Sequence, residues 1–183
     1  MKVIGIDPGS RVCGYGILEA RNGDIRYLAS GSISPGNSLP LYQRLKIIYE
    51  SLIGVIDEHS PEVMSVEDIF FAKNAKSAIK LGEARGVALL AASNSGLSIY
   101  EYSPTRIKLA LTGRGRANKS EMQKMLSIIL GVSEFETDDA SDAVAIALCH
   151  INLSRIEAKL GKEFTQPRKR RRRFTLNDLP SKG

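Results

Sequence analysis

The fold of this chain is decided near its start by residues 2–34, KVIGIDPGSRVCGYGILEARNGDIRYLASGSIS. Apolar and β-branched residues form three runs there, which predict strands over 2–7, 13–19 and 25–34. The turn Pro8-Gly9-Ser10 separates the first two runs, and Asn22-Gly23-Asp24, a strong hairpin signal, separates the last two. The chain is therefore expected to begin with antiparallel strands.

Beyond residue 40 the sequence predicts alternating helices and strands. A first helix is indicated by apolar residues at helical spacing, which are Leu41, Leu45, Ile48, Leu52 and Ile56. The other expected elements are a strand at 62–67, a helix at 74–94, a strand at 97–102, helices at 104–111 and 119–130, and a helix from 137 or 138 to about 160. Because crossover connections make strands parallel, this order predicts an α/β fold with a mixed sheet flanked by helices.

Acidic residues stand at the ends of the predicted elements. Asp7 ends the first strand and Glu67 ends the fourth, so both are expected at one edge of the sheet, where open α/β sheets usually place their sites. Asp139 and Asp142 are three residues apart at the start of the last helix and share a face. Asp139 lies on the side of the apolar stripe and Asp138 lies away from it, so we prefer Asp139 to Asp138 as the third member of the set.

Four carboxylates that meet without a Lys or Arg to neutralise them repel one another until a cation binds. Ligands that are all oxygen select hard ions, and Mg²⁺ takes one or two carboxylates each together with phosphate oxygens. The set therefore favours a pair of Mg²⁺ ions, or Mn²⁺ in their place, that assist hydrolysis of a phosphodiester. The alternative is that each acid is an ordinary turn or helix-start residue.

The composition, 43% hydrophobic and 25% charged, is that of an ordinary globular protein. We expect one domain over residues 1–160 and a basic, disordered tail over 161–183, which contains the cationic run Arg168–Arg173. No stretch is apolar enough to span a bilayer and no signal segment is evident, so the sequence predicts a cytoplasmic protein with no membrane partner.

The positive charge is segregated along the chain. Of the net charge of +6, +5 falls in residues 163–183. Residues 1–72 and 125–162 each carry −3, whereas residues 73–124 carry +7. An acidic framework around a basic middle suits a protein that binds both cations and a polyanion such as nucleic acid, although solvated faces produce such imbalances by chance.

Two segments near the acids suit a DNA substrate. Phe70 and Phe71 follow Glu67, and Lys73 and Lys76 come next. Aromatic rings stack on unpaired bases, although one of these two rings is as readily explained as core.

The second segment is the basic loop 112–120. It nearly imitates a nucleotide-binding phosphate loop, but Asn118 stands where a glycine is required. Its cations, which include Arg114, Arg116 and Lys119, are better suited to backbone phosphates of DNA.

Five motifs follow one another within residues 1–160. They are Gly5-Ile6-Asp7-Pro8-Gly9-Ser10-Arg11-Val12-Cys13-Gly14-Tyr15-Gly16, Val66-Glu67-Asp68-Ile69-Phe70, Ala72-Lys73-Asn74, Leu81-Gly82-Glu83-Ala84-Arg85-Gly86 and Asp139-Ala140-Ser141-Asp142-Ala143. In order and spacing they resemble the bacterial Holliday junction resolvase RuvC family. The resemblance implies a ribonuclease H-like fold with a five-stranded mixed sheet, and a homodimer that makes paired, symmetric nicks in four-way junction DNA.

The resemblance also assigns roles to residues of this chain. The metal-binding catalytic carboxylates would be Asp7, Glu67, Asp139 and Asp142. The base-contacting aromatic would be Phe70, and the DNA-contacting lysines would be Lys108 and Lys119.

The family works with the RuvA and RuvB branch-migration proteins. A dimer contact through the 74–94 helix would use Gly82 and Gly86 for close approach, although packing of these glycines on their own sheet is an equal alternative. The cationic run at 168–173 is not part of the family pattern.

Together these features predict a Mg²⁺-dependent, structure-selective endonuclease that hydrolyses phosphodiester bonds in DNA recombination and repair. Two alternatives stay open. One is a less selective ribonuclease H-like nuclease, and the other is a non-catalytic protein that binds branched DNA.

Overall fold

The computed structural model describes residues 1–68 and 75–161 of the chain. The elements, in order, are β1 (Lys2–Asp7), β2 (Cys13–Arg21), β3 (Asp24–Ile33), α1 (Leu41–His59), β4 (Val63–Glu67), α2 (Ala75–Asn94), β5 (Ser98–Tyr102), α3 (Pro104–Thr112), α4 (Lys119–Leu130) and α5 (Asp138–Leu160). The bounds agree with the predicted elements to within one or two residues. Residue 74 and residues 162–183 of the predicted tail lie outside the described residues.

The strands form the predicted mixed sheet, with five strands in the order β3-β2-β1-β4-β5. The β1–β2 and β2–β3 pairs are antiparallel, and the β1–β4 and β4–β5 pairs are parallel. Asn22 and Gly23 join β2 to β3 with φ values of 52° and 90°, the positive values that a type I′ hairpin turn requires. The antiparallel start predicted from residues 2–34 is confirmed.

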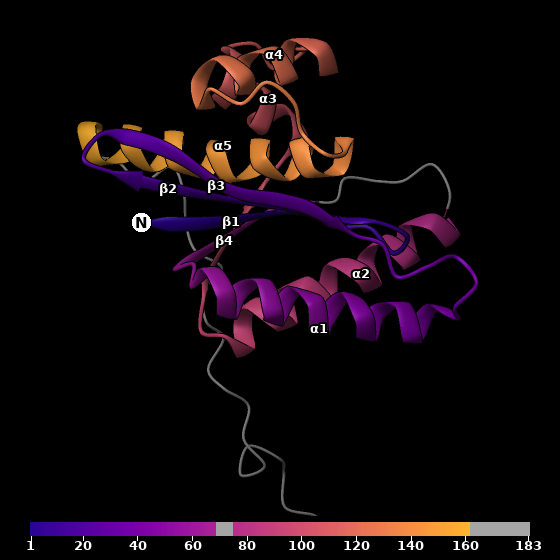
Figure 1. Cartoon of the computed structure of the whole chain (residues 1–183). Helices are drawn as coiled ribbons and strands as arrows, with labels where there is room; N and C mark the ends of the chain where they lie inside the picture. Colours follow the sequence, from indigo (N-terminus) through magenta and orange to yellow (C-terminus); the bar gives the residue numbers. More distant parts are fainter. Residues whose placement is uncertain (69–74, 162–183) are drawn as a thin grey trace, which may run out of the picture.

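Helices cover both faces of the sheet (Figure 1). Helices α1 and α2 lie against one face, where Ile48, Leu52 and Ile56 of α1 are buried as their spacing predicts. Helix α5 lies against the other face, and α3 and α4 pack on its outer side. Helix α5 is therefore enclosed between two layers, which explains why its middle part, from Ala143 to Ile151, is buried on all sides.

Glycines on β1 and β2 bring α5 unusually close to the sheet. A Cβ atom at Gly5 would collide with the carbonyl oxygen of Ala143, and one at Gly14 would collide with that of Asp139. The missing side chains let the helix backbone rest directly on the strands. The start of α5 is thereby placed beside the end of β1.

None of the helices within the described residues has the length and hydropathy needed to cross a membrane.

Candidate active site

Two of the four acidic residues stand at the ends of neighbouring strands. Asp7 is the last residue of β1 and Glu67 is the last residue of β4. The two strands run parallel, with Ile6 opposite Val66, so the next residue of each strand projects at the same edge. Sheet topology therefore brings together residues that are far apart in the sequence.

The start of α5 adds two more acids at this edge. Thr137 caps the helix, and its side-chain oxygen accepts a hydrogen bond from the main-chain N–H of Ala140 at 3.1 Å. Because Gly14 permits contact with the backbone of Asp139, the first turn of α5 is held against β2. Asp142 then lies in one pocket with Asp7 and Glu67, and Asp139 lies close enough for its charge to act on Asp7.

A pocket of about 340 Å³ opens between these elements. Asp7, Glu67 and Asp142 line it together with Lys108 of α3 and Lys119 of α4. Its other walls are apolar and come from Pro104, Ile107, Met122, Ala145 and Ile146. The pocket thus combines carboxylates and lysines in a partly apolar setting, where charges act on one another more strongly than they do in water.

Burial and neighbouring carboxylates raise the pKa of Asp7 and of Glu67. Burial, followed by the charges of Asp142, Glu67 and Asp139, raises the pKa of Asp7 to about 7, while Lys119 opposes the rise. The pKa of Glu67 is also raised, first by burial and then by Asp142, with Lys108 acting in the opposite direction. The four predicted acids therefore belong to one electrostatic cluster.

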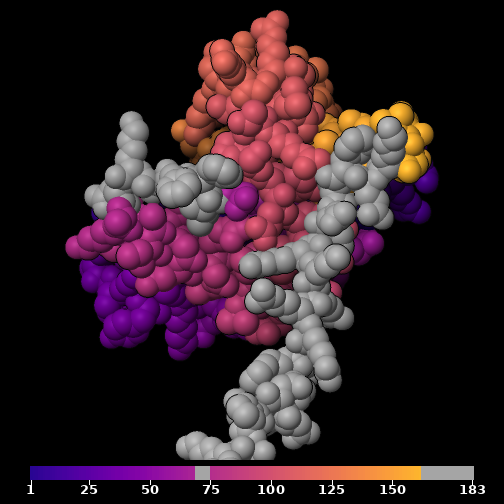
Figure 2. Space-filling model, turned by 180° about the vertical axis from the view of Figure 1, so that it is seen from behind, coloured from indigo at the N-terminus to yellow at the C-terminus, as the bar shows by residue number. Residues whose placement is uncertain are grey.

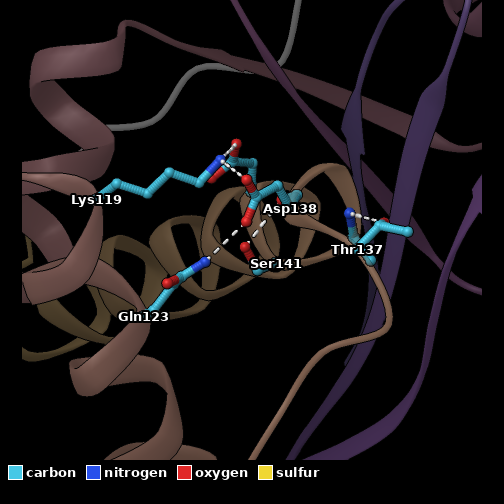
Figure 3. A network of polar contacts seen from close by, with 7 residues as sticks. Lys119, Gln123, Thr137, Asp138 and Ser141 are labelled. Carbon is cyan, nitrogen blue, oxygen red and sulfur yellow. Dashed lines mark hydrogen bonds and ion pairs between the residues drawn. The ribbon is translucent and has the colours of Figure 1, made fainter.

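Lys119 partly neutralises this cluster. Its Nζ atom lies 3.1 Å from Asp142 Oδ2 and 3.2 Å from Asp138 Oδ2 (Figure 3). Burial lowers the pKa of Lys119, but the hydrogen bonds and charges of Asp142 and Asp138 outweigh burial and raise it. The expectation that the carboxylates meet without a neutralising Lys or Arg is therefore wrong for Asp142.

Asp138 and Asp139 point to different surroundings. Asp138 is exposed, and its Oδ1 accepts a hydrogen bond from Gln123 Nε2 at 3.0 Å on the α4 side (Figure 3). Asp139 is partly buried and is one of the three carboxylates that raise the pKa of Asp7. This arrangement agrees with the preference for Asp139.

The donor set suits a hard divalent cation, although the described side chains form no ready-made cage. Among residues 1–68 and 75–161, no three His, Cys, Asp or Glu side chains come close enough to hold one ion together. Mg²⁺ commonly takes one or two carboxylates and completes its shell with water and phosphate. A bound cation would oppose the repulsion by which Asp142, Glu67 and Asp139 add to the raised pKa of Asp7.

The predicted DNA-binding residues fall into three groups. Lys108 and Lys119 line the pocket itself. Arg114 and Arg116 are exposed on the loop between α3 and α4, and Lys76 is exposed at the start of α2. Outside the described residues lie Phe70, Phe71 and Lys73.

Two arginines that the sequence reasoning did not single out support the strand ends. Arg44 Nη1 donates to the main-chain oxygen of Ser10, in the turn after Asp7, at 2.9 Å. Arg85 Nε donates to the main-chain oxygen of Glu67 at 3.2 Å. The position of Arg44, four residues before Ile48 on the buried stripe of α1, was a signal available in the sequence.

Comparisons with known proteins agree with one another. The family model "Crossover junction endodeoxyribonuclease RuvC" matches residues 3–150. A protein of that name from Trichlorobacter lovleyi is 41% identical over 169 residues, which are 92% of this chain and 95% of the relative. Another from Caldicellulosiruptor saccharolyticus is 46% identical over 153 residues, which are 82% of this chain and 92% of the relative.

Solved structures show the same relationship. The structure described as "T. thermophilus RuvC in complex with Holliday junction substrate" matches with a TM-score of 0.83 and 32% identity, over 91% of this chain and 99% of that one. The ribonuclease H-like fold expected from the sequence is confirmed by this match.

Proposed function

This chain belongs to the crossover junction endodeoxyribonuclease RuvC family, and on that premise we propose that it resolves four-way (Holliday) DNA junctions by paired, symmetric nicks. The reaction is hydrolysis of phosphodiester bonds in DNA recombination and repair. The observation that carries the proposal is the carboxylate cluster at the sheet edge, with the pKa of Asp7 raised to about 7 and two lysines in the same pocket.

We propose that Asp7, Glu67, Asp139 and Asp142 are the catalytic carboxylates and bind a pair of Mg²⁺ ions, for which Mn²⁺ can substitute. When bound, such ions supply activation of the attacking water and stabilisation of the leaving oxygen. The chain's own contribution is to hold the carboxylates together in a partly apolar pocket at the edge of the sheet. Support comes from the raised pKa of Asp7 and of Glu67, to which neighbouring carboxylates contribute after burial, because a bound divalent cation would oppose that repulsion.

The basic side chains around the pocket are proposed to bind the DNA backbone. Lys108 and Lys119 lie where a phosphate beside the carboxylates would lie, and Arg114 and Arg116 extend the positive surface along the α3–α4 loop. Phe70, Phe71, Lys73 and Lys76 remain proposed contacts to bases and phosphates. Most of these side chains belong to the basic middle of the chain, residues 73–124. We further propose that residues 1–160 form one nuclease domain and that residues 161–183 form a basic tail.

We propose a homodimer formed through the outer face of α2. Gly82 and Gly86 have open space where a side chain would stand, so the alternative that they pack on their own sheet is wrong. Ile79 and Leu90, on the same face, are 63% and 53% exposed. Figure 2 shows the magenta surface of α2 below the projecting α3 and α4. Exposed apolar residues next to glycines favour contact with a second helix.

Other partners follow from the proposed substrate. The RuvA and RuvB branch-migration proteins are the proposed functional partners, and the cytoplasm, where bacterial DNA is processed, is the proposed location. The presence of a Holliday junction in the structure of the Thermus thermophilus relative supports the choice of DNA substrate.

A direct test is to incubate the protein with a four-way junction, a matched duplex and an RNA–DNA hybrid, with and without Mg²⁺. We expect Mg²⁺-dependent, paired nicks in the junction alone. Asp7→Asn should abolish cleavage and leave junction binding nearly intact. Equal cutting of all three substrates would indicate a less selective nuclease, and normal cutting by Asp7→Asn would refute the proposed catalytic site.

A further inference from the structure

Arg85 joins α2 to the ends of two strands. Its side chain is 13% exposed and its Nε atom donates to the main-chain oxygen of Glu67 at 3.2 Å. The Nη2 atom of the same side chain lies 2.6 Å from Glu101 Oε2 on β5 and 3.8 Å from Asp68 Oδ1. One guanidinium thus contacts the main chain of a proposed metal ligand and two neighbouring carboxylates.

The main chain at Glu67 receives less support from the sheet than the rest of β4. Pairing of β4 with β1 stops at Val66, one residue earlier, whereas pairing with β5 continues to Glu67. The main-chain N–H of Asp68 still donates to the oxygen of Tyr102 at 2.8 Å, also on the β5 side. Arg85 therefore adds a contact from the helix layer at the residue where sheet pairing becomes one-sided.

The chemistry of arginine suits this task. A planar guanidinium donates in several fixed directions, so it can serve a carbonyl oxygen and a carboxylate at once, which a lysine ammonium cannot do with the same geometry. The charges of Asp68 and Glu101 hold the guanidinium in place, and its partial burial strengthens both ion pairs. The comparable contact of Arg44 with Ser10 supports the turn after Asp7 in the same way.

We propose that Arg85 is a positioning residue for Glu67, which fixes the strand end so that the Glu67 carboxylate points into the pocket. The inference rests on the proposed function, because it assumes that Glu67 takes part in cleavage. A guanidinium that acts on the main chain, and does not touch the reacting atoms, should affect the cleavage step and the binding of metal more than the binding of DNA.

The test compares Arg85→Met and Arg85→Lys with wild type in single-turnover cleavage of a four-way junction, alongside junction Kd. Arg85→Met should slow cleavage at saturating enzyme by at least about tenfold and change junction Kd by less than about twofold, because a misplaced Glu67 disturbs the reaction geometry and the metal site but not the surface that binds DNA. Arg85→Lys keeps the charge but loses the planar guanidinium that donates in several fixed directions. Its cleavage rate should therefore resemble that of Arg85→Met more than that of wild type.

A second readout does not depend on activity. At a given concentration, Mg²⁺ stabilises the folded protein more when it binds more tightly, so the rise in Tm on adding Mg²⁺ should be smaller for Arg85→Met than for wild type. The matched control is Arg155→Met, which removes an arginine that also donates to main-chain oxygens, those of Gly23 and Asp24, but at the opposite end of the sheet. The control should keep the wild-type cleavage rate and the wild-type response to Mg²⁺.

A second substitution, at Glu101, distinguishes positioning of Glu67 from general stabilisation of the fold. Arg85→Met removes this ion pair from the Glu101 carboxylate, which by itself destabilises the fold, and adding Glu101→Gln removes the charge that the ion pair balanced. The double variant should recover stability but stay slow, since the contact with the Glu67 carbonyl is still missing. Recovery of the wild-type cleavage rate would overturn the inference, as would wild-type cleavage by Arg85→Met alone. A wild-type protein that does not cut junctions would instead overturn the proposed function and this inference with it.

Discussion

Asp7 carries a charge that its surroundings disfavour. Its pKa in the folded protein is raised to about 7 by burial and by Asp142, Glu67 and Asp139, above the usual value of 3.8. Between these two values the folded protein keeps a proton that the unfolded chain has lost. The raised pKa of Asp7 therefore contributes stability to the folded protein that is fully present below pH 3.8 and is lost as the pH rises through about 7.

The Asp7→Asn variant should remove this pH dependence. At about pH 8 and without divalent metal, we expect the variant to be more stable than wild type by about 1–2 kcal/mol, after allowing for solvent screening, with a smaller difference at about pH 5. Chemical denaturation at both pH values measures the effect. Asp57→Asn, at an exposed site in α1, is the control, and equal stability of Asp7→Asn and wild type at the higher pH would contradict the prediction.

Asp138 and Asp139 form a natural pair of test and control. Asp139→Asn removes a carboxylate that acts on Asp7, whereas Asp138→Asn removes a partner of Gln123 and Lys119. We expect the first change to slow junction cleavage by at least about a hundredfold and the second by less than about tenfold. Rates in Mg²⁺ measure both, and the opposite ranking would assign the site carboxylate to Asp138.

At the scale of the secondary-structure elements, α5 packs so closely on the sheet that there is no room for an added side chain between them. A methyl group at Gly14 would collide with the backbone of Asp139, so Gly14→Ala must displace the start of α5 or β2. We expect a loss of about 1–3 kcal/mol of stability, typical of overpacking, together with a loss of cleavage activity. Denaturation and cleavage assays on the same variant measure the two effects.

Gly54→Ala is the matched control for this change. Gly54 lies in α1 and has no neighbouring atom within 4 Å of an added Cβ. Because alanine favours a helix over glycine by about 0.5–1 kcal/mol, the control should be neutral or slightly stabilised and fully active. If Gly14→Ala behaved in the same way, close contact between α5 and the sheet would not be required.

At the scale of the whole molecule, the proposed homodimer depends on the outer face of α2. The double change Ile79→Glu and Leu90→Glu places charges on this face, and we expect a monomer by sedimentation that accumulates singly nicked junctions instead of paired nicks. Ile128→Glu on α4 is the control, because Ile128 is similarly exposed, at 66%, but lies on another surface. A double variant that still sediments as a dimer would show that another face forms the contact.

The element order, the mixed sheet and the candidate acids could be predicted from sequence because they depend on local patterns. Apolar periodicity identified α1 and the strands, Asn22-Gly23 identified the hairpin, and the parallel crossover placed Asp7 and Glu67 at one edge. Each of these signals lies within a few residues or follows from chain topology. The preference for Asp139 over Asp138 came from the helical period in the same way.

The tertiary structure alone decided which distant side chains meet. The contact of Lys119 with Asp138 and Asp142 depends on how α4 packs beside α5, and the contact of Arg85 with Glu67 depends on how α2 lies under β4. Neither contact has a sequence spacing that could predict it, because the distance between two packed elements is set by all the side chains between them. The sequence by itself therefore determined which residues reach the site edge, and packing determined which partners hold them there.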